Sequence, residues 1–182
     1  MNRMVPGLDG GKMSSSDPNS KIDLLDPPGV VRKKVNAAFC EEGNIAENGL
    51  LAFVQAVLIP ISELYLERSK ETASADATTP VDKSPFVAHD APTGTVFTIH
   101  RDVKYGGPSH YPSFEEMQKH FADKQLHPGD LKASVTNAIN VLLQPIRKAF
   151  EENQEWQAVE KLAYPDPNAR IQKKKKVVVY SA

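Results

Sequence analysis

A helical spacing of apolar residues constrains the fold of this 182-residue chain more than any other feature. The apolar positions recur every three or four residues, at Leu131, Val135, Ala138, Ile139, Leu142, Leu143, Ile146 and Phe150. This period places them on one face of an α-helix, and that face must pack against other elements. His127-Pro128-Gly129-Asp130 precedes the pattern and is the expected start of the helix. The chain is therefore expected to have a helical core.

Two helices are predicted before this one. Residues 28–40 carry apolar side chains at helical spacing, with Asp26 as the expected N-cap and Pro27 in the first turn. A longer helix is expected after Asn48, because a second apolar face follows it, made of Leu50, Leu51, Val54, Val57, Leu58, Ile61 and Leu64. Pro60 lies inside that pattern and should kink or break the helix.

Shorter elements are predicted around the long helix. Ser113-Phe114-Glu115-Glu116 matches a capping box that opens a helix, and a last short helix is indicated around Trp156. The alternation over 95–100 predicts a strand, with a weaker second strand near 109–112. Residues 69–94 lack an apolar stripe and are expected to be a flexible surface insertion. The predicted fold class is mainly α: a helical bundle with one short β hairpin.

Composition narrows the setting of the protein. Hydrophobic residues make up 40% of the chain, enough for a core, and we find no apolar run near the roughly 20 residues of a membrane span. The single cysteine, Cys40, suits a reducing compartment. The net charge of −1 conceals a basic tail from Arg170 onward, which either touches phosphates or is simply solvated. No metal site is expected.

The stretch Gly10-Gly11-Lys12-Met13-Ser14-Ser15-Ser16 has the composition of a phosphate-binding loop. Glycines let the backbone approach a ligand, Lys12 supplies a positive charge, and Ser14, Ser15 and Ser16 supply neutral donors. Such a set can stabilise negative charge that develops on phosphate oxygens. Glycine-rich loops with a lysine are common, however, so on this chemistry alone a plain mobile surface loop is the favoured alternative.

A second group of residues has the chemistry to bind one RNA base. Tyr105 precedes Gly106-Gly107, and His127 and Asp130 stand at the expected helix start. An aromatic ring and an imidazole can stack on an unpaired base, while a carboxylate accepts hydrogen bonds from guanine. Structural roles stay open as well: Asp130 as a helix cap, Tyr105 packed on the core, and His127 as a loop residue.

Lys12-Met13-Ser14-Ser15-Ser16 resembles the lysine-methionine-serine signature loop of class I aminoacyl-tRNA synthetases. The flanks Met4-Val5-Pro6-Gly7-Leu8 and Ser20-Lys21-Ile22-Asp23-Leu24-Leu25-Asp26 resemble the tyrosyl enzymes of eukaryotes and archaea. The resemblance implies that the loop acts on ATP, through Lys12 and Ser14 above all, while magnesium is held through a catalytic domain outside this chain. Ser15 stands where many members have a second lysine, which leaves Lys12 as the only charged member of the signature.

His127-Pro128-Gly129-Asp130-Leu131-Lys132 and Lys104-Tyr105-Gly106-Gly107 resemble the anticodon-binding motifs of the tyrosyl family. The resemblance implies that Tyr105 and His127 stack on the first anticodon base, a guanine, and that Asp130 reads its edge. The implied partner is tRNA(Tyr). The implied parent protein is a cytoplasmic homodimer whose dimer contacts lie mostly in another domain.

The implied organisation has three parts. Residues 1–26 form the ATP-handling loop at the end of a catalytic domain, residues 27–168 the anticodon-binding helical domain, and residues 169–182 the basic tail. The sequence contains neither a His-x-Gly-His signature nor a glycine-rich dinucleotide motif, so this chain alone is expected to be catalytically inactive. A stand-alone RNA-binding module and a tryptophanyl enzyme are the alternatives. The Lys12 loop disfavours the first, and the segments at 21–26 and 127–132 disfavour the second.

Overall fold

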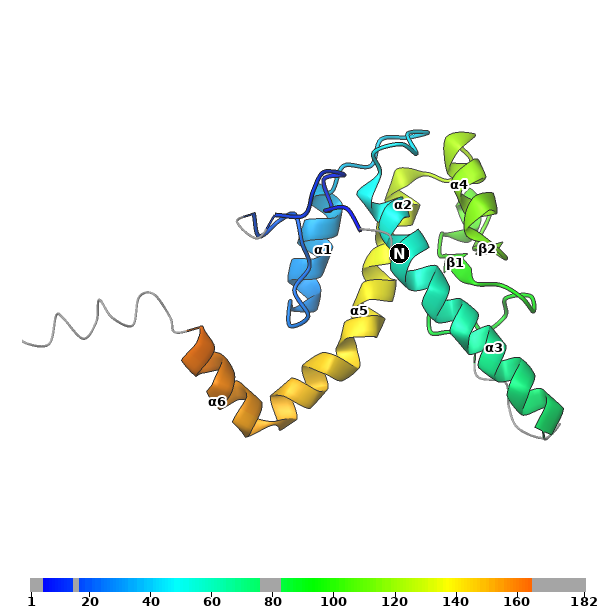
Figure 1. Cartoon of the computed structure of the whole chain (residues 1–182). Coiled ribbons are helices and arrows are strands. Elements are labelled where there is room, and N and C mark those ends of the chain that lie inside the picture. The colour runs from blue at the N-terminus through cyan, green and yellow to red at the C-terminus, as the bar shows by residue number, and fades with distance from the viewer. Residues whose placement is uncertain (1–4, 15–16, 76–82, 165–182) are drawn as a thin grey trace, which may run out of the picture. The chain divides into compact units, whose positions relative to one another are not determined.

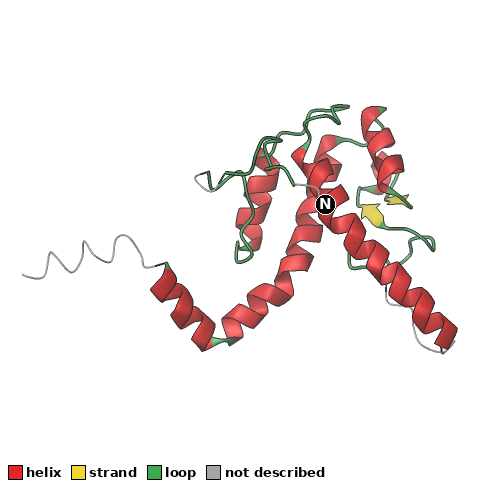
Figure 2. Cartoon of the chain, viewed as in Figure 1, coloured by secondary structure: helices red, strands yellow, loops and turns green. Residues whose placement is uncertain are grey.

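The structure is a computed structural model that describes residues 5–14, 17–75 and 83–164, without the side chains of 72–75. The chain divides into two compact units, Met1–Leu143 and Gln144–Ala182. Helices dominate the described residues, and the only sheet among them has two strands (Figures 1 and 2). The predicted fold class, mainly α with a short hairpin, is confirmed at this level.

Helix α1 spans Pro28–Ala37 and packs through Val31 and Val35, which are fully buried. Its N-cap is Pro27, without a side-chain cap, so the expected capping role of Asp26 is wrong. Asp26 instead accepts a hydrogen bond from the Asp23 amide at 2.9 Å and pairs with Lys34 Nζ at 2.5 Å. Because both side chains of this pair are largely buried, the pair fixes the end of the N-terminal loop to α1.

The second helical segment runs through three elements without a break: α2 (Gly49–Phe53), the π-helical turn η1 (Val54–Leu58) and α3 (Ile59–Ala75). Asn48 caps it as predicted, by accepting a hydrogen bond from the Leu51 amide at 3.1 Å. The π turn ends just before Pro60, and the Ile59 amide donates to the Val54 carbonyl five residues back. A wider turn at this point accommodates the ring and missing donor of Pro60, so the helix continues.

The segment Gly49–Glu71 of this helix is long and apolar enough to cross a membrane by length and composition alone. An apolar run near that length was not expected from the sequence, and that expectation is not confirmed. Core helices of soluble proteins share this length and composition. Leu50, Val54 and Leu58 are fully buried in the protein core, and 39% of the apolar window is buried.

The hairpin consists of β1 (Phe97–Ile99) and β2 (Ser109–Tyr111), close to the predicted positions. The strands are antiparallel, with Thr98 opposite His110. Between them lies the short 3-10 helix η2 (Val103–Tyr105). Phe97, Ile99 and Tyr111 are buried in the core, so the hairpin is anchored on one side by apolar packing.

The structure differs from expectation at both described ends of segment 69–94. Residues 69–75 continue α3, and residues 83–94 pack on the hairpin. The Phe86 side chain is only 4% exposed, and its carbonyl accepts from the Thr98 amide at 3.0 Å. Ser84 bonds Ser62 of α3 at 2.7 Å in a buried position. Residues 76–82 lie outside the described residues.

Helices α4 (Phe114–Ala122) and α5 (Pro128–Glu152) follow the predicted patterns. Ser113 caps α4 by accepting from the Glu116 amide at 3.3 Å. Of the long apolar stripe, five members are buried: Leu131, Val135, Ala138, Ile139 and Leu143. The division between the two units falls after Leu143, next to Pro145 inside α5. In the second unit α6 spans Gln154–Ala163, and Trp156 is 54% exposed.

Candidate functional site: the signature loop and the start of helix α5

The N-terminal loop is held in shape by its own hydrogen bonds. The Gly7 amide donates to the Gly11 carbonyl at 2.8 Å, and the Leu8 amide donates to the Ser20 carbonyl at 3.0 Å. The Ser20 hydroxyl, only 2% exposed, accepts from the Ser14 amide at 3.1 Å and lies 3.0 Å from the Ser14 carbonyl. These bonds bring the two flanks of the signature segment together, so Lys12 and Met13 lie between two tethered ends.

Two glycines allow the N-terminal loop to pack closely against the start of α2. Gly10 has φ +84° and lies against the Glu47 carbonyl, while Gly49 lies against the Gly7 carbonyl. A Cβ at either glycine would clash with backbone oxygen, and Gly10 also needs a left-handed conformation that other residues rarely adopt. The loop and α2 therefore approach each other at backbone contact distance.

Lys12 and Met13 lie on the exposed side of the loop. Lys12 is exposed, Met13 is 46% exposed, and both line a pocket of about 370 Å³ together with Gly10 and Gly11. An exposed ammonium beside two glycine backbones has the freedom to meet a phosphate group. Of the other predicted members, Ser14 is half-buried within the loop, and Ser15 and Ser16 lie outside the described residues.

His127 stands immediately before the first turn of α5. Its Nδ1 accepts a hydrogen bond from the Gly129 amide at 3.0 Å, and its carbonyl accepts from the amides of Asp130 and Leu131. The backbone donor fixes Nδ1 as an acceptor, so a neutral imidazole carries its proton on Nε2. The ring is thereby oriented, exposed, and able to donate from Nε2.

Asp130 is the third residue of α5, so the helix cap that we considered for it is supplied by His127. Negative charge in the first turn of a helix is stabilised by the helix dipole. Within the described parts of the chain, the Asp130 carboxylate forms no hydrogen bond or ion pair, and Asp130 is half-buried. It is therefore available as an acceptor at the surface.

The turn bearing Tyr105 is joined to the same helix through the hairpin. The His100 amide, just after β1, donates to Ser134 Oγ of α5 at 3.0 Å. Ser134 lies one helical turn after Asp130, and residues four apart share a face of a helix. Tyr105 follows five positions after His100 on η2, and its ring is 65% exposed with Lys104 Nζ 4.8 Å from its centroid. The hydrogen bond thus attaches the end of β1, five residues before Tyr105, to α5 one turn after Asp130.

The Tyr105 turn is rigid enough to present a ring. Gly106 and Gly107 have φ +98° and +74°, which explains the two glycines, and Arg101 Nε donates to the Gly107 carbonyl at 2.7 Å. Arg101, Ser134 and Ser20 were not predicted from the sequence, although their side chains bond the backbone of the segments that carry the candidate residues. No cluster of metal-ligating side chains occurs among the residues that the structure describes.

Comparisons with a protein-family model and with known proteins all match tRNA synthetases. Residues 1–144 match the family described as tRNA synthetases class I (W and Y). The chain is 47% identical over 177 residues to the cytoplasmic tyrosine–tRNA ligase of Saccharomyces cerevisiae, covering 97% of this chain and 39% of the relative. It is 32% identical over 163 residues to the tyrosine–tRNA ligase of Haloarcula marismortui, covering 90% of this chain and 38% of the relative.

A solved structure agrees. The tyrosyl-tRNA synthetase from Archaeoglobus fulgidus, complexed with L-tyrosine, is 33% identical with a TM-score of 0.56, covering 79% of this chain and 35% of that chain. The chain thus spans about two fifths or less of the length of these relatives. Enzymes of this family use ATP and have tRNA as their partner. The chain belongs to the class I tRNA synthetases for tryptophan and tyrosine, and its relatives are tyrosine–tRNA ligases of the eukaryotic and archaeal type.

Proposed function

We propose that this chain is the anticodon-binding part of a cytoplasmic tyrosine–tRNA ligase, and that its N-terminal loop contributes to ATP handling in the complete enzyme. The complete reaction joins tyrosine to AMP with release of pyrophosphate and then transfers tyrosine to tRNA(Tyr). The proposal is supported by the exposed Tyr105 and His127 rings and the half-buried Asp130 at the start of α5, together with the His100–Ser134 hydrogen bond that attaches the hairpin to that helix.

The three side chains have complementary tasks in binding one guanine. The exposed Tyr105 ring offers a stacking surface on the face that Lys104 Nζ, 4.8 Å from the ring centroid, does not cover. The His127 ring, oriented by the Gly129 amide, offers a second surface. Asp130 accepts the two hydrogen bonds that guanine donates from N1 and N2, and no other base presents that donor pair.

The N-terminal loop has the second task. The Lys12 side chain is exposed and lines an open pocket. Such a position is expected of a group that contacts ATP phosphates during adenylate formation. This loop favours an enzyme part over a stand-alone RNA-binding module, because RNA binding alone gives such a loop no purpose. The adenosine and tyrosine sites would come from a Rossmann-type domain outside this chain, as would most of the dimer contacts. We therefore expect no tyrosine-dependent pyrophosphate exchange from the 182-residue chain alone.

The proposal is tested by titrating the chain with tRNA(Tyr) transcripts that carry guanine or adenine at the first anticodon position. Asp130→Asn removes one acceptor and places a donor against a guanine donor, so the preference for guanine should fall by roughly tenfold or more. Glu63→Gln, which removes an exposed charge on α3, is the matched control and should leave the preference intact. Equal loss of affinity for both transcripts in Asp130→Asn would assign Asp130 a purely structural role.

A further inference from the structure

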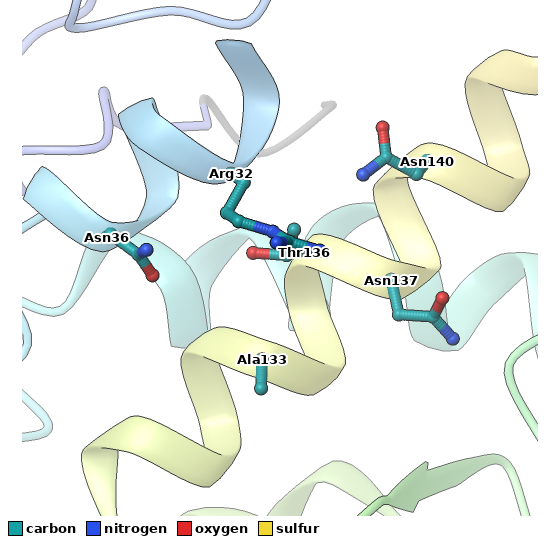
Figure 3. A pocket seen from close by; sticks show the side chains of 6 residues that line it. All are labelled: Arg32, Asn36, Ala133, Thr136, Asn137 and Asn140. Atoms are coloured by element: carbon teal, nitrogen blue, oxygen red, sulfur yellow. The ribbon is translucent and has the colours of Figure 1, made fainter. Parts of the chain in front are cut away.

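A polar groove separates α1 from the first half of α5. Its volume is about 290 Å³, and it is lined by Arg32, Asn36, Ala133, Thr136, Asn137 and Asn140. Figure 3 shows Arg32 reaching from α1 toward Thr136 on α5, with Asn137 and Asn140 along the same helix. Lys132 Nζ donates to the Asn36 carbonyl at 2.8 Å and so fixes the two helices at the end of the groove.

A buried polar atom in this groove has no partner. Thr136 is only 7% exposed, and its Oγ1 forms no hydrogen bond within the described chain. Buried hydroxyl groups are nearly always paired, because leaving one unpaired costs free energy. A valine at this position would fill the same volume without that loss. The hydroxyl therefore indicates a ligand that enters the groove and pairs with it.

The charge of the groove defines the ligand. Helix α1 contains no acidic residue, and α5 contains none from Leu131 to Lys148. Arg32 offers five N–H donors in a planar fork, and the asparagine amides and the Thr136 hydroxyl offer neutral donors. A donor-rich, acid-free groove with one guanidinium suits a phosphate group with an attached sugar, since arginine binds phosphate oxygens in bidentate fashion.

We propose that the α1–α5 groove binds one phosphodiester unit of the tRNA, beside the anticodon base held by Asp130. This inference rests on the proposed function and adds a second, sequence-independent contact to it. Ala133 and Thr136 follow Asp130 by one and two turns, so the groove begins within about 10 Å of Asp130 along the helix axis. Arg32 holds the phosphate, and Thr136 and Asn137 donate to phosphate or 2′-hydroxyl oxygens.

The test compares two neighbouring charge removals on α1. Arg32→Gln should weaken binding of the tRNA transcript about tenfold at 0.1 M salt and reduce the slope of log K against log salt by about one. Lys33→Gln removes the same charge from an exposed residue that does not line the groove, and should change affinity less than twofold. Equal effects of the two variants would show diffuse attraction and overturn the site.

A second variant separates binding from folding. Thr136→Val preserves the side-chain shape and removes the unpaired hydroxyl, so the melting temperature should stay or rise while affinity for RNA falls about threefold. Both groove variants should weaken the binding of transcripts with guanine and with adenine equally, whereas Asp130→Asn should change the preference between them. If Asp130→Asn alters base preference while both groove variants bind normally, the groove has another occupant and the inference fails. If no variant matters and the unaltered chain does not bind tRNA, the proposed function fails instead.

Discussion

Gly49, the first residue of α2, lies directly against the carbonyl oxygen of Gly7 in the N-terminal loop, before the signature segment. The contact leaves no room for a side chain, and both residues are buried. It ties the position of Lys12 to the helix that begins the core. The carbonyl of Leu8 also lies near, and Leu8 itself is 7% exposed in the core. The described part of the loop before Lys12 is thus held against α2.

The contact predicts a steric effect of Gly49→Ala. The added methyl group must displace the loop backbone, so we expect a loss of about 1–3 kcal/mol in the free energy of unfolding. Urea unfolding measures this. Gly29→Ala is the control: its Cβ meets nothing within 4 Å, and alanine favours a helix, so stability should stay or rise by up to about 1 kcal/mol. A neutral Gly49→Ala would show that the loop does not rest on α2.

Phe86 gives a second stability prediction. It is 4% exposed and packs on the core from a segment that its composition marks as flexible. Phe86→Ala should lower the free energy of unfolding by about 3–5 kcal/mol, the usual range for a buried phenylalanine. Val103→Ala, at a residue 84% exposed, should change it by less than about 0.5 kcal/mol in the same thermal or urea unfolding experiment. Similar losses in the two variants would contradict the packing of residues 83–94.

Elements that depend on local sequence signals were predicted, whereas features that depend on contacts between distant residues were not. The helices of the core were predictable because periodicity and caps such as Asn48 and Ser113 are local signals. The burial of Phe86 was not, because its contacts come from Thr98 and the hairpin. The cap at α5 was also missed: histidine is an unusual cap, and Asp130 was the more typical candidate. The α1–α5 groove joins residues about a hundred positions apart, which no local pattern indicates.

Cys40 gives a prediction about pH. Burial raises the pKa of the Cys40 thiol, only partly offset by the hydrogen bond from Asn48 Nδ2 at 3.4 Å and the charge of Lys132. The thiolate is the reactive form, so alkylation by iodoacetamide should be slow at neutral pH, with a midpoint above that of an ordinary cysteine. The same chain in urea should react with an ordinary midpoint. A native midpoint at or below the unfolded one would contradict the buried thiol.

Lys12 gives a kinetic prediction that depends on the proposed function. In a full-length ligase containing this sequence, Lys12→Ala should slow adenylate formation while tyrosine affinity stays nearly unchanged, because the lysine acts on charge that develops in the transition state. A drop of roughly a hundredfold in the single-turnover rate is expected, the usual scale for losing one such group. Lys21→Ala is the control, because Lys21 pairs with Asp23 at 3.4 Å and lies outside the signature. Equal effects of the two substitutions would deny Lys12 a special role.

His127 allows its capping and stacking roles to be separated. The Gly129 amide donates to Nδ1, and an asparagine oxygen at position 127 can accept the same hydrogen bond, because asparagine is a favourable N-cap. His127→Asn should therefore keep the stability of α5 while removing the aromatic surface. His127→Ala should lose both, with about 1 kcal/mol of stability lost with the cap. Thermal unfolding of both variants measures the first property.

Binding of tRNA measures the stacking role of His127. If His127 stacks on an anticodon base, both substitutions should weaken binding by roughly 1–3 kcal/mol, and equally for guanine and adenine, because every base has a face to stack. Tyr105→Ala should behave in the same way and leave folding unchanged, since the Tyr105 ring is 65% exposed. If His127→Asn binds tRNA as tightly as the unaltered chain while His127→Ala does not, the imidazole serves only as the cap of α5. The base would then be held by Tyr105 and Asp130 alone.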